Sequence, residues 1–201
     1  YLKSGDPEAA SRYFDSALAE AALFTDEASR KRMTALSYLQ MAGLARSRGD
    51  VAGSTDLYRQ ADELYDSLSI PFNQYIAEKG VLSGLKELGD NAELDRLLPL
   101  TIKLAEDYQE KISEEAERAS YLDDGITIYD FALEREFEKG DQVKAFAFSE
   151  LSVSRTLYQR LAALSGVPAR PLTLDEIRDK MPDRTQILKF AVLKTRTLAW
   201  V

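Results

Sequence analysis

The dipeptide Gly-Asp recurs along this chain, and each copy separates two stretches whose apolar residues repeat with helical spacing. The copies are Gly5-Asp6, Gly49-Asp50, Gly89-Asp90 and Gly140-Asp141, and their glycines are 44, 40 and 51 residues apart. Glycine adopts the left-handed conformation that ends many helices, and an aspartate after it can cap the next helix. Periods of this length are typical of stacked helix pairs. We therefore expect an all-α fold, a right-handed solenoid of antiparallel helix pairs.

The composition is that of a globular protein. Of the 201 residues, 45% are apolar and 30% are charged, close to the averages for folded domains. No apolar run approaches the roughly 18 residues that cross a bilayer, and no basic and apolar leader opens the chain. We expect a soluble protein, most simply cytoplasmic. Because residue 1 is tyrosine and not methionine, we also expect that the natural N-terminus is missing, which leaves the periplasm and secretion open.

The chain contains neither cysteine nor histidine. Thiol nucleophiles, disulfides, Cys/His zinc sites and Ser-His-Asp triads are therefore all excluded. No glycine-rich phosphate loop or cluster of metal ligands is present in the sequence. We expect no cofactor, no metal and no catalysis by this polypeptide.

The net charge of −8 is unevenly distributed. Residues 1–104 carry −4, residues 105–141 carry −9 and residues 142–201 carry +5. An acidic surface repels phosphate backbones, so we expect no nucleic-acid partner. Basic residues near the C-terminus offer an alternative nucleic-acid surface, but no stacking aromatics accompany them. They are Arg155, Arg160, Arg170, Arg178, Lys180 and Arg184.

The repeats resemble the tetratricopeptide pattern, in which large and small residues alternate at fixed offsets so that two helices interlock. The fit is best around Gly49, where the matching residues are Tyr38, Met41, Ala42, Ala45, Ser54, Tyr58 and Ala61. Around Gly5 only the second helix matches, with Ala10, Phe14 and Ala17, and it is expected to run from Pro7 to about Phe24. The first repeat is thus expected to be truncated.

The repeat around Gly89 is expected to be irregular. Gly80 and Gly84 are predicted to interrupt its first helix, and Pro99 is predicted to kink or restart its second, since proline removes a helical hydrogen bond. Its second-helix positions are filled by Leu94, Leu98 and Thr101.

Two further helices are predicted at 111–139, with a possible break at 123–125, and from Gly140 to about Leu164. The sequence then predicts a linker over 166–173 and a capping box at Thr173 and Glu176, followed by a helix to about Met181. Alternation predicts a hairpin with strands at 186–193 and 198–201. We expect a domain of about four helix pairs over 1–165 and the start of a second, truncated α/β domain over 174–201.

The second half of the chain resembles the family of caspase-like domains called CHAT, together with the tetratricopeptide helices that lead into them. The similar stretches are Arg118 to Leu122 with Tyr129, Gly140-Asp141, Ala145 to Glu150 with Arg155, Pro171 to Ile177, Met181-Pro182, Thr185 to Phe190 and Leu198 to Val201. The resemblance implies a cysteine peptidase whose catalytic histidine and cysteine lie downstream. No catalytic residue can be carried over. It implies that the chain is the N-terminal recognition and regulatory module of such a protein.

The predicted function is a protein interaction scaffold. In such a stack the first helix of each pair lines a concave groove that holds a peptide or partner segment. The expected groove residues are Leu39, Arg46, Lys79, Ser83 and Lys86. Arg46, Lys79 and Lys86 would suit a carboxylate or an acidic peptide. The plainer interpretation is that these are ordinary solvent-exposed residues of amphipathic helices.

Three other functions remain open at this point. The helices could hold the missing peptidase domain inactive until a ligand changes them, or the chain could be a stand-alone adaptor for an acidic peptide with no peptidase link. A carboxylate enzyme is the third, but Glu114-Glu115 and Asp123-Asp124 are neighbours that point about 100° apart on a helix. The oligomeric state is not predicted.

Overall fold

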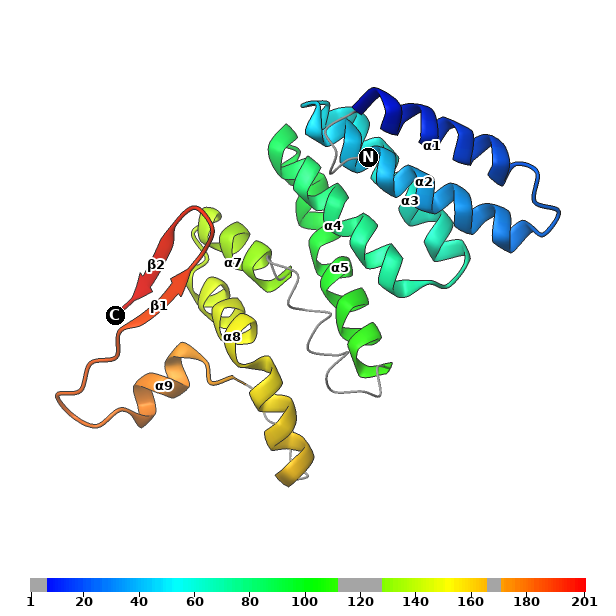
Figure 1. Cartoon of the computed structure of the whole chain (residues 1–201). Helices are drawn as coiled ribbons and strands as arrows, with labels where there is room; N and C mark the ends of the chain where they lie inside the picture. The colour runs from blue at the N-terminus through cyan, green and yellow to red at the C-terminus, as the bar shows by residue number, and fades with distance from the viewer. Residues whose placement is uncertain (1–6, 112–127, 166–170) are drawn as a thin grey trace. The chain divides into compact units, whose positions relative to one another are not determined.

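A computed structural model describes residues 7–111, 128–165 and 171–201 of the chain (Figure 1). These residues form eight helices and a two-stranded antiparallel sheet, which confirms the all-α class with a C-terminal hairpin. The elements are α1 (Pro7–Ala21), α2 (Glu27–Ser47), α3 (Val51–Ser67), α4 (Pro71–Leu88), α5 (Asn91–Lys111), α7 (Ile128–Glu138), α8 (Gln142–Ser165), α9 (Leu174–Lys180), β1 (Lys189–Val192) and β2 (Thr197–Trp200).

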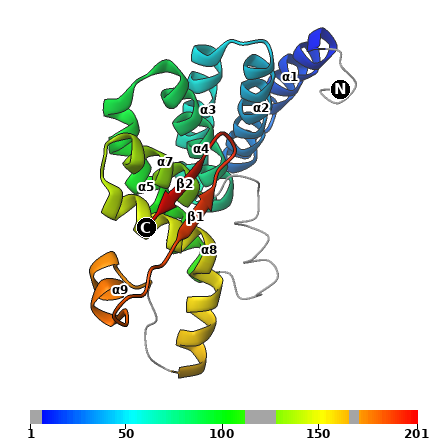
Figure 2. The ribbon, with the colours of Figure 1, turned by 90° about the vertical axis from the view of Figure 1, so that its left-hand side faces the viewer.

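The chain divides into two compact units, Tyr1–Lys111 and Ile112–Val201. We call the first, with α1 to α5, the helical unit and the second, with α7 to α9 and the strands, the hairpin unit. In the helical unit each helix packs on the next in chain order (Figures 1 and 2). The expected domains divided at residue 165, whereas α7 and α8 belong to the same compact unit as the hairpin.

The glycines of the Gly-Asp dipeptides end one helix and allow the next to begin. Gly49, Gly89 and Gly140 have φ angles of 81°, 75° and 80°, in the left-handed region where a side chain would be strained. They join α2 to α3, α4 to α5, and α7 to α8. The predicted hinge is confirmed at these three copies, and Gly5-Asp6 lies outside the described residues.

In each of these three copies the aspartate caps the helix that follows. The Asp50 carboxylate accepts a hydrogen bond from the Gly53 N–H at 2.8 Å, and the Asp50 N–H donates to the Ala45 carbonyl at 3.0 Å. Asp90 and Asp141 make the same two kinds of bond. Together these bonds satisfy backbone groups of both helices that the turn would otherwise leave free.

A different sequence forms the turn between α3 and α4. Ser69 has a φ of 53°, its N–H donates to the Asp66 carbonyl at 2.9 Å, and the Ile70 N–H donates to the Tyr65 carbonyl at 3.0 Å. Pro71 then begins α4, where its fixed φ suits a helix start. Backbone geometry here matches that of the Gly-Asp turns, but the left-handed residue is serine.

Small residues at the predicted repeat positions lie where the helices touch. Ala42, Ser54 and Ala61 have no exposed surface, and the Ser54 hydroxyl donates to the Ala42 carbonyl at 2.8 Å, which ties α3 to α2. Ala35, Ala61, Tyr65 and Ala77 form one core cluster across α2, α3 and α4. In the next pair Leu94, Leu98 and Thr101 are also buried, as their positions in the pattern predicted.

Two expected irregularities are absent from the described helices. α4 runs through Gly80 and Gly84 without a break, because both glycines admit side chains of α3, so the predicted interruption is wrong. α5 runs through Pro99, so the predicted restart is also wrong. Pro99 is exposed, so water can satisfy the carbonyl that loses its helical partner. α1 ends at Ala21, three residues before the predicted Phe24.

In the hairpin unit the sheet packs on the α7–α8 pair. β1 and β2 pair in a register that sets Ala191 opposite Leu198, and both are buried against Leu133 and Ala145. The Trp200 ring meets Phe146 of α8 edge to face at 5.8 Å.

The capping box before α9 is confirmed. The Glu176 N–H donates to the Thr173 hydroxyl at 3.2 Å, and the Thr173 N–H donates to the Glu176 carboxylate at 2.8 Å. α9 ends at Lys180, one residue before the predicted end. The predicted break at 123–125, the pairs Glu114-Glu115 and Asp123-Asp124, the stretch Arg118 to Leu122 and most of the 166–173 linker lie outside the described residues.

Candidate peptide-binding face

Arg46 links the first helices of two successive helix pairs, α2–α3 and α4–α5. From α2, its Nη2 donates to the Ser83 hydroxyl of α4 at 2.9 Å and pairs with the Glu87 carboxylate one turn further along. The structure therefore brings together two of the five predicted groove residues, Arg46 and Ser83. Glu87 was not predicted, although it lies one turn after Ser83 on the same helix.

The Arg46 guanidinium is already engaged within the chain. Its side chain is 27% exposed and that of Glu87 is 52% exposed, so the pair lies at the surface. Nη1 of Arg46 is buried and has no hydrogen-bond acceptor. Burial raises the pKa of the nearby Tyr58, and the positive charge of Arg46 partly offsets that rise. An acidic partner would have to compete with Glu87 for this guanidinium.

The other predicted groove residues have different surroundings. Leu39 is half-buried and packs against the core cluster, so it supports the fold as well as the face. The Lys79 ammonium lies 5.1 Å from the centre of the Tyr75 ring, within range of a cation–π contact. Lys86 is half-buried in the last turn of α4, where a positive charge complements the helix dipole.

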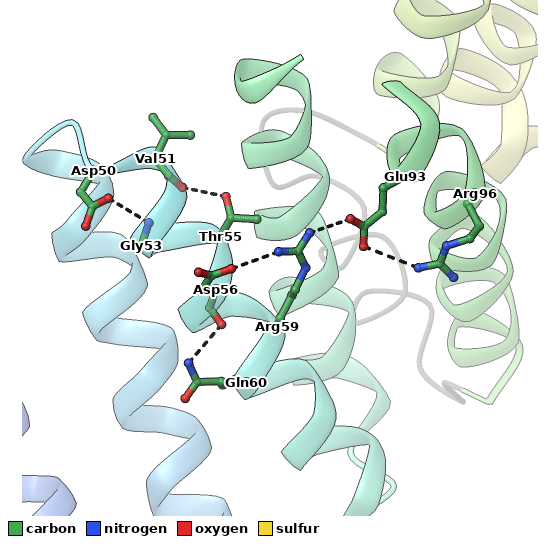
Figure 3. A network of polar contacts seen from close by, with 9 residues as sticks. All are labelled: Asp50, Val51, Gly53, Thr55, Asp56, Arg59, Gln60, Glu93 and Arg96. Carbon is green, nitrogen blue, oxygen red and sulfur yellow. Dashed lines mark hydrogen bonds and ion pairs between the residues drawn. The ribbon is translucent and has the colours of Figure 1, made fainter. Parts of the chain in front are cut away.

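A second link joins the other helices of the same two pairs. Arg59 of α3 pairs with Asp56 at 3.1 Å on its own helix and with Glu93 of α5 at 2.8 Å. Glu93 also lies 3.6 Å from Arg96. Figure 3 shows this network, with Arg59 reaching from α3 to Glu93. The two helix pairs are thus connected by one charged link between first helices and another between second helices.

Between these two links, glycines let α3 approach α4 closely. A Cβ atom on Gly80 would lie 2.5 Å from the Tyr58 ring, and one on Gly84 would overlap the Thr55 side chain. Gly43 of α2 differs, because a Cβ atom there would meet nothing within 4 Å. Packing therefore explains why positions 80 and 84 are occupied by glycine, but it does not explain the glycine at position 43.

The hairpin unit contains a separate cavity of about 350 Å³ between α8, α9 and the strands. Its walls are largely apolar and include Phe146, Ile177, Met181 and Trp200. Its carboxylate Glu150 is paired with Lys189. Acid–base catalysis would need two facing carboxylates. The cavity thus offers an apolar surface whose lining residues do not include such a pair.

Comparison with protein families, with characterised proteins and with solved structures gave no match for this chain. In the part of the chain that the structure describes, no helix is both long and apolar enough to cross a membrane. Among the same residues no group of three or more Asp and Glu side chains is arranged to hold a metal ion. The site must therefore be interpreted from its own geometry.

Proposed function

We propose that the helical unit is a stack of tetratricopeptide-like repeats that binds an extended peptide along the face formed by α2 and α4. The observation that carries the proposal is the direct link between these helices, Arg46 to Ser83 and Glu87. It joins the first helices of successive pairs, which line the concave side of such stacks. The repeated Gly-Asp hinge and the buried small residues support the same arrangement.

The partner would carry a carboxylate that replaces Glu87 at Arg46. Arg46 contributes a guanidinium from α2 to this face, and arginine binds carboxylates in a planar, bidentate geometry. Lys79 lies one turn before Ser83 on α4 and Lys86 lies within one turn after it, and both would extend the positive side of the site. Glu87 would then act as an internal competitor that keeps affinity moderate and selects strongly acidic segments.

Residues 1–165 would serve as the recognition module of a caspase-like CHAT peptidase, and residues 174–201 would begin the peptidase domain. Support comes from the way that Ala191 and Leu198 are buried against Leu133 and Ala145 of the α7–α8 pair. A shift of that pair would be transmitted directly to the strands. Catalysis would then belong to a part of the protein with the cysteine and histidine that this chain lacks.

The test is binding of short fluorescent peptides, graded from neutral to strongly acidic, to the full chain. Arg46→Glu is expected to weaken the acidic peptides by about tenfold or more, as truncation of a central arginine does in many interfaces. Glu87→Gln is expected to strengthen them by up to about fivefold, because a surface ion pair contributes about 1 kcal/mol or less. Neutral peptides should respond little to either change.

Arg96→Glu is the matched control, since it reverses a surface arginine on α5 and leaves the α2–α4 face unchanged. Equal losses for Arg46→Glu and Arg96→Glu would show that only net charge matters and would contradict the proposed face. Specific binding that leaves the activity of a linked peptidase unchanged would favour the stand-alone adaptor.

A further inference from the structure

Three carboxyl groups meet at the α3–α4 contact around one amide. Gln74 of α4 donates from Nε2 to Asp66 at 3.3 Å and to Glu78 at 3.4 Å, and it also hydrogen-bonds Asp62. Asp62 and Asp66 come from α3, whereas Glu78 comes from α4. One side-chain amide has only two N–H groups, so it cannot satisfy all three carboxyls.

Two of these groups are left with buried oxygens that lack donors. Oδ1 of Asp62 and Oε2 of Glu78 are buried without a hydrogen-bond partner, and Glu78 is only 7% exposed. The Thr101 hydroxyl of α5 lies beside Glu78, and the Leu97 carbonyl at 3.2 Å competes with Glu78 for its single proton. A buried carboxylate without donors is strongly disfavoured unless it takes up a proton.

The charged groups that act on this pair are acidic. Burial has the largest effect on Asp62, and the charges of Glu78, Asp66 and Glu63 act in the same direction. For Glu78 burial again comes first, Asp66 adds to it, and Thr101 and Gln74 offset part of the rise in its pKa. No compensating arginine or lysine is among these groups, which come from α3, α4 and α5.

We propose that Asp62 and Glu78 form a carboxyl pair that holds one proton at neutral pH and so makes the stacking of the two helix pairs dependent on pH. The pair lies where α3 of one helix pair meets α4 of the next. Loss of the proton to solvent would leave two like charges in a poorly hydrated contact. The helix pairs would then separate more easily, and any partner face that spans α2 and α4 would lose its geometry.

The sign of the effect is opposite to that of ordinary acid denaturation. The pKa of Asp62 is raised from 3.8 to about 7, so the folded chain binds this proton more tightly than the unfolded chain. Stability from this group is therefore full below about pH 4 and is lost as the pH rises toward 7. A carboxylate in a salt bridge would behave in the reverse way.

The direct experiment is a carbon-detected NMR titration of the full chain with isotope-labelled aspartate and glutamate, followed from pH 4 to 9. Asp62 is expected to titrate near pH 7, and Glu78 is expected to titrate above its ordinary range of about 4. Titration of both groups near 4 would overturn the proposal without any need for a variant.

Variants test the consequence for stability. Asp62→Asn keeps the shape and removes the charge, and at pH 8 it is expected to lower the unfolding equilibrium constant by about tenfold or more, one pKa unit being a factor of ten. Below about pH 4 it should have little effect, because both the folded and the unfolded chain then hold the proton. Asp15→Asn is the matched control, because it makes the same change at an exposed position on α1, outside the α3–α4 contact. Parallel pH profiles for the native chain and Asp62→Asn would contradict the proposal.

Discussion

The turns within the α2–α3 and α4–α5 pairs and the turn from α3 to α4 make the same backbone hydrogen bonds but have different sequence signals. Within a pair, Gly49 or Gly89 provides the left-handed residue and an aspartate caps the next helix. In the turn from α3 to α4, Ser69 takes a φ of 53° and is followed by Ile70 and Pro71, without a side-chain cap. The first turn is specified locally. The second depends on how well α3 and α4 pack, so the two should respond differently to substitution.

The largest effect on stability is expected at the contact between α3 and α4. Gly84→Ala places a methyl group against Thr55 and is expected to destabilise the chain by about 1 to 3 kcal/mol, as overpacking does. Gly43→Ala is the matched control, because the space there is open, and it should stabilise α2 by up to about 1 kcal/mol. Urea unfolding would measure both. Equal effects at the two glycines would mean that α4 does not pack on α3 as described.

Substitutions in the two turns are expected to change the stability of the chain in opposite directions. Gly49→Ala forces a side chain into the left-handed region and is expected to cost about 1 kcal/mol or more. Ser69→Gly relieves the same strain and should stabilise the chain by a smaller amount, up to about 1 kcal/mol, since glycine also loses more entropy on folding. Thermal unfolding of the two variants beside the native chain provides the measurement. A destabilised Ser69→Gly chain would show that the serine side chain stabilises the turn.

What the sequence predicted and what it missed follow the same division between local and distant interactions. The hinges at Gly49, Gly89 and Gly140 and the box at Thr173 depend on residues within a few positions of each other, so the pattern of the chain revealed them. In the sequence alone, Gly80 and Gly84 are indistinguishable from glycines that break a helix. Their role depends on Tyr58 and Thr55, about one helix away, which no local rule identifies.

The candidate site divides in the same way. Repeat spacing placed Arg46 and Ser83 on the face that they share, because helical periodicity assigns residues to faces. It did not reveal Glu87 as the partner of Arg46, nor the carboxyl pair Asp62 and Glu78, because periodicity assigns a residue to a face but does not identify the side chain that it meets on the neighbouring helix. An acidic residue in an amphipathic helix looks solvent-exposed until the neighbouring helix is placed over it.

The smallest effect is expected at the charged link between second helices, where Arg59 meets Glu93 at 2.8 Å. Both side chains are about one-third exposed, so water and salt weaken the pair. A double-mutant cycle with Arg59→Met and Glu93→Gln is expected to give a coupling of about 0.2 to 1 kcal/mol. The coupling should fall as salt rises. A larger, salt-insensitive coupling would mean that this link, and not the packing of α3 on α4, holds successive pairs together.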